Sequence, residues 1–523
     1  MLLIIWTNKS TAQYGQLPPF TFEIQAIPGT NLAGLHSFAF AQSGDKWLFI
    51  GGRTNGLHGL NSSGGFPPEY KNENVIVIDT STWTSYSADL NQLSYAIADP
   101  MRSTNMQYIQ DGNFLYMLGG YGYDSVASMF VTFPKLTAIH VDNIISAVIN
   151  AQPIAPHIRQ VADTNLQVCG GEMGKIGSDF YLLFGHNFGG RYTDPPSPLW
   201  TQTYSDRIKK FNINDDGTTI TLSNYSYFLD TTNYHRRDLS SGPVVRPDGS
   251  FGLGAYGGVF RREENIPFLE PITVEASGTT VSPYEQTMSH YSCALIPVYD
   301  SVTQKMYSTF LGGISLNDYN PSTGLIVYDS LVPFISDITT LTVNSDATAE
   351  ECVLPLQMPG LLGTNAKFIL NNNLSIYSNE VIRFRDLPAS YNVLAGYMFG
   401  GIRAQQGNFG LSAANDTIYR VYIKRVSSMI SVEESDQSVR NISIFPNPTA
   451  GNSTLQFRLT ATEKIRISVQ DLTGKEMLLV ADEEMQKGLN IKQINTSGLP
   501  NGVYICRISS AKGESILKLV TGK

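Results

Sequence analysis

The chain has 523 residues, a formal net charge of −9, and charged side chains at only 15% of its positions. This acidic balance argues against nucleic-acid binding, because the neutralisation of phosphates requires clustered Lys and Arg. The length allows two or three domains, and the abundant Gly, Tyr and Phe favour many short strands joined by turns over charged amphipathic helices.

The N-terminus begins with the apolar segment MLLIIW and then turns small and polar. With Ser10 and Ala12 ahead of Gln13, residues 1–12 resemble the end of a secretory signal peptide that is cut after Ala12. The basic start of such a peptide is missing, and a frayed strand is the alternative interpretation. The segment is too short to span a membrane, and no other stretch of the sequence reaches that length.

An apolar strand that ends in a glycine pair recurs along the chain. Its six copies are Trp47–Gly52, Leu115–Gly120, Tyr181–His186, Gly252–Gly258, Ser308–Gly313 and Gly396–Gly401. Most copies follow a short strand and a turn such as SGD or PDG, and precede a further strand such as NVIVID. His186 replaces the second glycine in the third copy, and an insertion around Leu354–Leu387 stretches the sixth.

Each copy therefore has the composition of one four-stranded blade, and the repeat resembles the kelch repeat. The resemblance predicts an all-β fold, with a six-bladed kelch-like β-propeller over residues 17–425. We expect the glycines where backbones approach so closely that a Cβ has no room. Residues 17–26 are expected to supply a strand that pairs with the last blade. A pair of β-sandwiches with fortuitous glycines is the alternative.

The segment over residues 426–440 is polar and breaks the repeat, so it is interpreted as a linker. Residues 441–523 alternate apolar and polar positions between turns, which predicts a small Ig-like β-sandwich. The motifs FPNPT, DLTGK, LPNGVY and a closing KLV resemble the type A sorting domain of type IX secretion cargo. The residues that carry this resemblance are Phe445, Pro446, Asn447, Pro448, Asp471, Gly474, Lys475, Asn501, Gly502, Tyr504 and Lys518.

The resemblance to this sorting domain implies a Bacteroidetes source, periplasmic transit, and export through the type IX translocon with its outer-membrane shuttle components. The protein would then be secreted or held at the cell surface, either released or attached to lipopolysaccharide. An ordinary Ig-like accessory domain is the alternative interpretation.

Polar residues at or just before the first strand of several blades are the candidate ligand-binding residues, because this strand lines the central channel of a propeller. They are His36, Arg102, Asp163, Arg236, Arg237, Asp238, His290 and Tyr291. Such a ring suits an anionic or hydroxylated ligand. Alternatively, these residues satisfy backbone groups around a water-filled channel.

The sequence does not identify the ligand, and loops rich in Tyr, Asn, Gly and Pro suit the binding of glycans or of surface proteins in foraging, adhesion or gliding. A sugar-modifying enzyme, similar to the kelch sialic acid epimerases or a lyase, is the competing hypothesis, but no motif identifies catalytic residues. Tyr291 and Cys293 lie beside His290, yet the His pair of copper radical oxidases is absent. We therefore expect no metal and no cofactor.

The four cysteines, Cys169, Cys293, Cys352 and Cys506, are widely spaced and form no disulfide scaffold. The sequence does not decide whether the first three form disulfide bonds. Cys506 is expected to be a buried apolar residue.

Overall fold

The computed structural model describes residues 16–30, 32–59, 65–193, 200–320, 323–408, 410–426, 438–472, 474–511 and 513–522. The predicted signal peptide, residues 1–12, lies outside the described residues, as do residues 427–437 of the predicted linker. The chain divides into two compact units, Met1–Ser427 and Ser428–Lys523. No helix of the described residues has the length and apolar character needed to cross a membrane.

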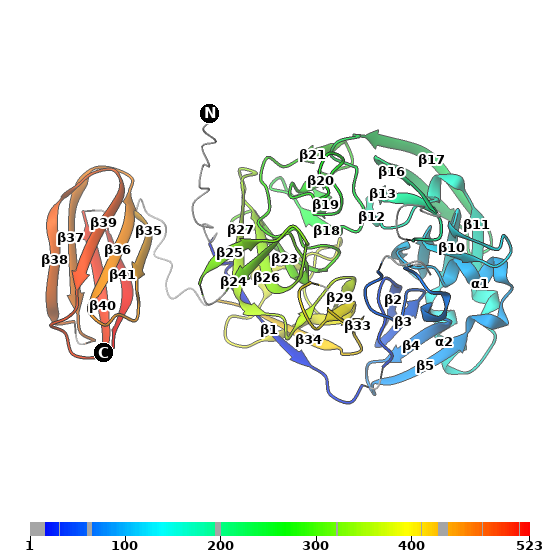
Figure 1. Cartoon of the computed structure of the whole chain (residues 1–523), viewed down its shortest axis with the longest axis horizontal. Coiled ribbons are helices and arrows are strands. Elements are labelled where there is room, and N and C mark those ends of the chain that lie inside the picture. Colours follow the sequence, from blue (N-terminus) through cyan, green and yellow to red (C-terminus); the bar gives the residue numbers. More distant parts are fainter. Residues whose placement is uncertain are drawn as a thin grey trace. The chain divides into compact units, whose positions relative to one another are not determined.

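The described part of the first unit contains six sheets of four or five strands, and nearly all their strand pairs are antiparallel (Figure 1). The first sheet contains β2 (Ala39–Ser43), β3 (Lys46–Ile50), β4 (Asn74–Asp79) and β5 (Thr84–Asp89). The second contains β6 (Gln107–Asp111), β7 (Phe114–Leu118), β10 (Lys135–His140) and β11 (Ile158–Ala162). The third contains β12 (Glu172–Ile176), β13 (Asp179–Leu183), β16 (Arg207–Asp215) and β17 (Ile220–Leu229).

The later sheets follow the same plan. The fourth contains β18 (Ser240–Val245), β19 (Phe251–Tyr256), β20 (Ile272–Val274) and β21 (Thr279–Val281). The fifth contains β22 (Ala294–Asp300), β23 (Lys305–Ile314), β26 (Phe334–Val343) and β27 (Ala349–Gln357), with the short β30 (Ile382–Arg383) parallel to β22. The sixth contains β29 (Ala366–Leu370), β31 (Val393–Gly400), β34 (Tyr419–Arg425) and β1 (Phe20–Ala26).

The sixth sheet joins the two ends of this unit. Strand β1 pairs with β34 in a register that runs from Phe20 opposite Arg425 to Ala26 opposite Tyr419. The N-terminal segment therefore completes the last sheet, as the sequence predicted.

Smaller elements follow the second strand of several sheets, and one short strand follows the fourth strand of the fifth sheet. They are β8 (Tyr121–Asp124) with β9 (Met129–Thr132), β14 (His186–Gly190) with β15 (Trp200–Tyr204), β24 (Asn317–Asn320) with β25 (Leu325–Tyr328), and β28 (Leu361–Leu362) with β32 (Ile402–Ala404) and β33 (Ser412–Ala414). Two short helices, α1 (Tyr95–Met101) and α2 (Val141–Ile149), pack on the core between the first and second sheets. The hairpins β8–β9, β14–β15 and β24–β25 begin within four residues of a glycine pair or its equivalent. They therefore extend that end of their sheets.

Apolar side chains fill the spaces between neighbouring sheets, including the space between the sixth sheet and the first. In that last space the Trp47 ring lies 5.0 Å from the Tyr397 ring, and the Phe49 ring lies 5.0 Å from the Phe399 ring. The core is thus a series of layers that returns to its starting point.

The glycine pairs lie where one sheet approaches the next. The segment that leads into the first strand of each sheet is called its approach segment. A Cβ on Gly119 would stand 1.8 Å from the carbonyl oxygen of Val168, which lies in the approach segment of the third sheet. A Cβ on Gly400 of the sixth sheet would stand 2.6 Å from the carbonyl oxygen of Leu35, which precedes the first sheet. The expected close approach of backbones is confirmed.

The third copy of the glycine pair is shifted by one residue from the predicted alignment. Phe184 and Gly185 adopt the two left-handed conformations, with φ of 56° and 79°, that the glycine pair adopts elsewhere. His186 then follows the pair and bridges Cys169, just as Arg53 bridges His36. The prediction that His186 replaces the second glycine is therefore wrong.

The second unit is a two-sheet sandwich. One sheet contains β35 (Val439–Phe445), β36 (Asn452–Leu459) and β39 (Gly488–Asn495), and the other contains β37 (Glu463–Gln470), β38 (Glu476–Met485), β40 (Gly502–Ser510) and β41 (Gly513–Thr521). Leu455, Phe457, Ile467, Val469 and Cys506 are fully buried between the sheets. All four cysteines of the chain are free and buried, so Cys506 has the predicted apolar environment.

The motif FPNPT packs against the last strand. The Asn447 side chain donates to the Lys518 carbonyl oxygen at 2.7 Å and accepts from the Val520 amide at 2.8 Å. These two bonds hold the first turn of the unit against β41. The hydroxyl of Tyr504 donates to the Pro500 carbonyl oxygen at 2.9 Å, within the LPNGVY motif.

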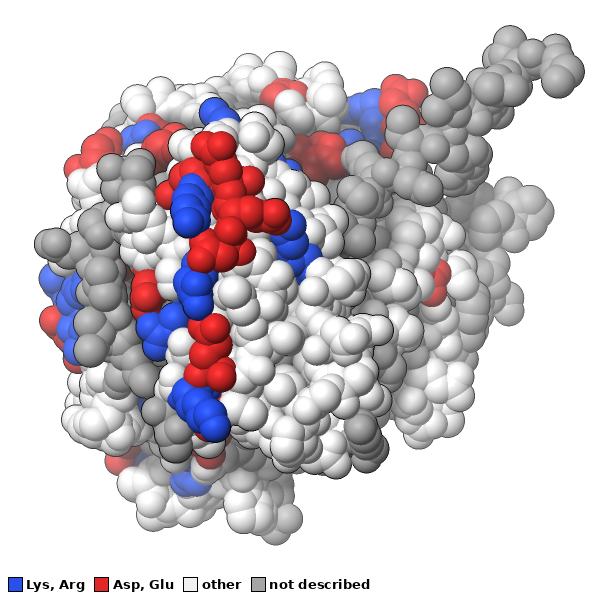
Figure 2. All heavy atoms as spheres, turned by 90° about the vertical axis from the view of Figure 1, so that its left-hand side faces the viewer, with Lys and Arg blue, Asp and Glu red and all other residues white. Residues whose placement is uncertain are grey.

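A band of alternating charge marks one face of the molecule (Figure 2). Its ion pairs in the second unit link β37, β38 and β39, and join Lys464 to Asp482, Arg466 to Asp482 and Glu476, and Lys492 to Glu483. Such alternation places charges on β38, an edge strand that would otherwise offer its backbone to another chain.

Candidate functional site

A pocket of about 730 Å³ lies where the approach segments of the six sheets converge. The residue directly before the left-handed residue of the approach segment lines the pocket in five of the six sheets. One position of the repeat supplies His36, Thr104, Cys169, Arg237 and Tyr291, all of which line the pocket. Each of these forms an isolated backbone bridge with a residue just after the glycine pair, respectively Arg53, Tyr121, His186, Val259 and Ile314.

The next residue of every approach segment forms a ring that floors the pocket. Its members share a left-handed backbone, with φ between 45° and 66°, and are Ser37, Asn105, Gly170, Asp238, Ser292 and Asn365. Several are linked head to tail by backbone hydrogen bonds, such as Gly170 to Asn105 at 2.9 Å and Asp238 to Gly170 at 2.6 Å. A smaller cavity of about 350 Å³ lies on the other side of this floor and shares Ser37, Asn105, Asp238 and Asn365 with the pocket.

An ion pair lies at the centre of the pocket. The Arg237 guanidinium donates to the Asp238 carboxylate, which also accepts from the Tyr291 hydroxyl at 2.9 Å and from the Asn105 amide at 3.0 Å. Burial opposes both charges, but the pairing outweighs it, so the pKa of Arg237 lies above and that of Asp238 below its ordinary value. The pair is thus charged, and its net charge is zero.

Three imidazoles line the pocket in the neutral state. Burial, with nearby arginines as a further cause, lowers the pKa of His36 and of His186 to about 3 and that of His58 to about 4. The Gln202 amide lies 2.6 Å from His186 Nδ1. In contrast, His36 Nε2 and His58 Nδ1 are buried without a hydrogen-bond partner among the described residues. These two nitrogens therefore carry unsatisfied hydrogen-bonding capacity in the pocket lining.

Aromatic side chains form one wall of the pocket. Phe66, Tyr121, Phe188 and Tyr192 contact one another edge to face, with ring centroids 5.2 to 5.9 Å apart. They come from the long loop after the first glycine pair and from the β8 and β14 hairpins. The additions that follow the glycine pairs thus build this wall above the ring.

Four of the eight predicted ligand-binding residues line the pocket, namely His36, Arg237, Asp238 and Tyr291. Of the others, Arg102 lies in a neighbouring compartment, where it pairs with Glu73 and Asp99. Asp163 caps a short 3₁₀ helix, accepting from the Asn165 amide, and it also accepts from the Tyr225 hydroxyl at 2.7 Å.

Arg236 and His290 are fully buried away from the pocket. Arg236 donates to the carbonyl oxygens of Asn233, Gly257 and Glu270, so it satisfies backbone groups. Both residues immediately precede the pocket-lining Arg237 and Tyr291, but their side chains are buried in the packing of the sheets, and His290 has a left-handed backbone with φ of 41°.

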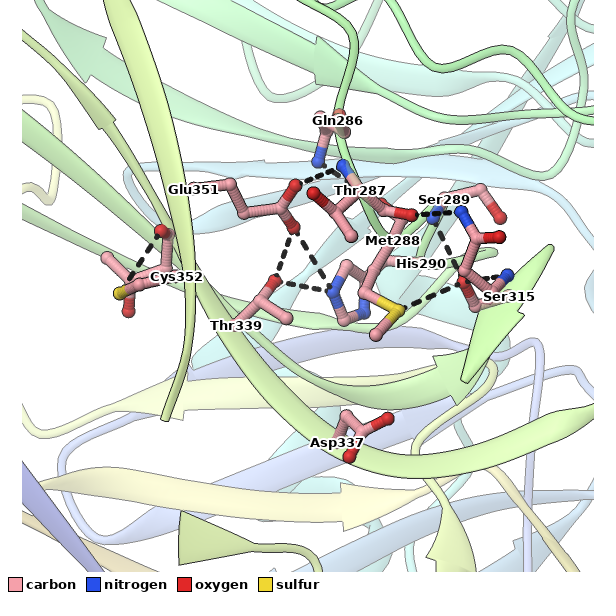
Figure 3. Close-up of polar contacts among 12 residues, drawn as sticks. Gln286, Thr287, Met288, Ser289, His290, Ser315, Asp337, Thr339, Glu351 and Cys352 are labelled. Carbon is pink, nitrogen blue, oxygen red and sulfur yellow. Dashed lines mark hydrogen bonds and ion pairs between the residues drawn. The ribbon is translucent and has the colours of Figure 1, made fainter. Parts of the chain in front are cut away.

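His290 belongs to a buried polar cluster of the fifth sheet (Figure 3). Its Nδ1 lies 2.9 Å from the Gly312 carbonyl oxygen, and its Nε2 lies 2.6 Å from the Thr339 hydroxyl oxygen. That hydroxyl oxygen is 2.8 Å from the carboxyl group of Glu351 on β27. The cluster holds the approach segment against β26 and β27.

Several pocket residues were not among the sequence predictions, notably Arg53, His58, Phe66, His186 and Tyr192. Arg53 and His186 follow the glycine pair or its equivalent directly, so a fixed offset from the pair would have identified them. The other three lie in loops without a repeated position, and the sequence carries no signal for them.

The described residues contain no cluster of three or more His, Cys, Asp or Glu side chains that could hold a metal ion. Tyr291 and Cys293 point to different partners, because the Tyr291 hydroxyl binds Asp238 whereas the Cys293 thiol lies beside the Ser240 hydroxyl.

Comparison with solved structures gives several full-length but distant likenesses. A fungal alcohol oxidase of the AA5 family in complex with copper is 9% identical, with 96% of this chain and 100% of that chain covered and a TM-score of 0.37. YjhT is 11% identical, with 76% and 99% covered and a TM-score of 0.41. PorZ, an essential surface component of the type IX secretion system of Porphyromonas gingivalis, is 9% identical, with 96% and 100% covered and a TM-score of 0.13. At these scores the likenesses carry no argument about this chain.

No curated protein sequence matches the chain. Residues 443–521, however, match the family described as the secretion system C-terminal sorting domain. This match covers the sandwich and its packed motifs. The chain therefore carries a C-terminal sorting domain that directs its export by type IX secretion to the cell surface or the medium.

Proposed function

We propose that the six sheets are the blades of a six-bladed kelch-like β-propeller over residues 17–425. The packing of the sixth sheet on the first supports this architecture, as does the Gly401 amide, which donates to the Leu35 carbonyl oxygen at 3.0 Å. A signal peptide over residues 1–12, a linker over 426–440 and a sorting domain over 441–523 complete the proposed organisation. The sorting domain would bind the translocon and its outer-membrane shuttle components.

We further propose that the exported propeller binds a glycan in its central pocket. One observation carries this proposal: an aromatic wall stands beside two buried imidazole nitrogens that have no hydrogen-bond partner among the described residues. Sugars offer apolar ring faces and hydroxyl groups, which suit aromatic side chains and hydrogen-bonding nitrogens respectively.

The aromatic wall provides the first test. We expect Tyr192→Ala to weaken glycan binding by about tenfold or more, because the ring supplies one face of the pocket. Tyr227→Ala is the matched control, since Tyr227 is 59% exposed on β17 and does not line the pocket. Binding is measured on a glycan array and then by calorimetry on the best ligand.

Loss of binding in the Tyr192 variant alone, with both variants melting at the wild-type temperature, would support the proposal. Equal binding by both variants, or no glycan bound by the wild-type protein, would contradict it.

A sugar-modifying enzyme is the second candidate function, because neutral imidazoles with unpartnered nitrogens can accept a proton from a sugar hydroxyl. Turnover of the bound sugar, followed by NMR and lost in His36→Gln, would favour the enzyme. Unchanged sugar over days of incubation would leave binding as the function.

A further inference from the structure

The glycan pocket continues into a second, much smaller compartment. Arg53, Phe66, Thr104 and Tyr121 line both spaces, so they form the passage between them. The second compartment lies between the first two sheets and is closed at its far side by Tyr123 and Phe130 of the β8–β9 hairpin.

The cations that line the two compartments are almost all neutralised by neighbouring carboxylates. Arg237 pairs with Asp238, Lys71 pairs with Glu73 at 2.5 Å, and Arg102 pairs with Glu73 and Asp99. Arg53 differs, because no carboxylate of the described residues lies within ion-pair distance of it. The Arg53 guanidinium therefore has no direct ion pair, and the Glu69 carboxylate acts on it only from a longer distance.

Neutral oxygen atoms hold the Arg53 guanidinium in place. Its Nε donates to the Asn55 side-chain oxygen at 3.1 Å and its Nη2 donates to the Pro67 carbonyl oxygen at 2.8 Å. Its guanidinium carbon lies 5.4 Å from the centre of the Phe66 ring. The residue is only 5% exposed, and burial lowers its pKa to about 10, so the charge has lost most of its hydration. A buried charge of this kind is strongly stabilised by an anion.

We propose that the site takes an acidic oligosaccharide, whose carboxylate or sulfate group binds Arg53 while its neighbouring sugar units lie along the central pocket. This inference rests on the proposed glycan-binding function and specifies the class of ligand. The aromatic wall of the pocket holds a sugar face, and Arg53 selects the acidic unit beside it.

The test compares four probes by calorimetry at low salt: a tetrasaccharide of galacturonic acid, a neutral tetrasaccharide of galactose, a sulfated galactose tetrasaccharide, and free galacturonic acid. The proteins are the wild type, Arg53→Gln and Arg53→Lys. Lys305→Gln is the control, since Lys305 lies at the β22–β23 turn outside both compartments. Melting temperatures establish that each variant is folded.

We expect the wild type to bind one of the acidic tetrasaccharides at least about tenfold more tightly than the neutral one and than the monomer. Arg53→Gln should remove this preference, Arg53→Lys should restore part of it, and Lys305→Gln should leave it unchanged. The better of the two acidic tetrasaccharides identifies the acidic group as carboxylate or sulfate.

Equal affinity of the wild type for acidic and neutral tetrasaccharides would overturn the inference and leave the glycan-binding function standing. The same holds if Arg53→Gln keeps the preference, or if the monomer binds as tightly as the tetrasaccharide. If Arg53→Gln fails to fold, the salt dependence decides, because an ion pair with the ligand must weaken between 20 mM and 500 mM NaCl, whereas a preference that is independent of salt would contradict it.

Discussion

Glu351 has a buried carboxyl group whose polar neighbours are mostly uncharged (Figure 3). It accepts from the Thr287 amide, and its Oε1 lies 2.8 Å from the Thr339 hydroxyl oxygen. The Gly312 carbonyl requires a hydrogen on His290 Nδ1, so Nε2 of the neutral ring is an acceptor. The single hydroxyl hydrogen of Thr339 satisfies Nε2, and a protonated Glu351 then satisfies the Thr339 oxygen. The burial that raises the pKa of Glu351 to about 7 and lowers that of His290 to about 4 agrees with this arrangement.

The substitution Glu351→Gln tests this protonation state. Because the folded protein holds the Glu351 proton up to about pH 7 and the unfolded chain releases it near pH 4.5, the free energy of unfolding should fall as pH rises through this window. Glutamine mimics the protonated acid, so the variant should gain stability relative to the wild type from pH 5 to pH 8, by up to about 3 kcal/mol. Urea unfolding at several pH values measures the difference.

Glu350→Gln, at the adjacent position of β27, is the control and should show no such pH-dependent gain. A Glu351→Gln difference that is constant with pH, or that grows toward acid pH, would show that Glu351 is ionised in the folded protein.

The register of the approach segments limited how far the candidate site could be predicted from the sequence. His36, Arg237, Asp238 and Tyr291 were identified because they stand beside a short apolar strand. Arg236 and His290 stand one residue further away, and their side chains are buried in the sheet packing instead of the pocket. Polarity alone does not distinguish these positions, whereas the left-handed residue after each pocket position does.

At the scale of the elements, the glycine pairs determine how closely successive sheets approach. Gly119 and Gly112 both have left-handed backbones, with φ of 67° and 57°. A Cβ on Gly119 would meet the Val168 carbonyl oxygen, whereas a Cβ on Gly112, in the β6–β7 turn, meets nothing within 4 Å. Substitutions at these two positions therefore distinguish the cost of crowding between sheets from the cost of backbone strain.

We expect Gly119→Ala to lower the free energy of unfolding by about 3 kcal/mol or more, since both strain and displacement of the third sheet contribute. Gly112→Ala should cost about 1 kcal/mol from the backbone conformation alone. Chemical unfolding of both variants measures the difference, and equal losses would mean that the glycine pair serves the turn rather than the contact between sheets.

Most strands could be predicted from the sequence, because alternating apolar residues and turn residues mark them locally. The glycine pairs also predicted where successive sheets approach one another. Only the third pair differs from its predicted position, because Phe184 adopts a left-handed conformation that the sequence assigns to glycine. The hairpins β8–β9 and β14–β15 were less visible, because their strands are short and their packing depends on Phe130 and Phe188 meeting across different sheets.

At the scale of the whole molecule, the two units have separate tasks. The sandwich over residues 443–521 directs export, and the first unit carries the pocket that would act outside the cell. The chain bears a net charge of −9, so an acidic ligand is repelled by the protein as a whole and must be attracted locally at Arg53. Under the proposal, Arg53 supplies the local attraction that the net charge of the chain does not.

The most direct test of the central claim is a crystal structure of the protein with the tightest-binding acidic tetrasaccharide. We predict density for the sugar in the central pocket, with its acidic group on Arg53, one ring against Tyr192, and hydrogen bonds to His36 Nε2 or His58 Nδ1. A tetrasaccharide bound elsewhere on the surface, with the central pocket holding only water, would contradict the account.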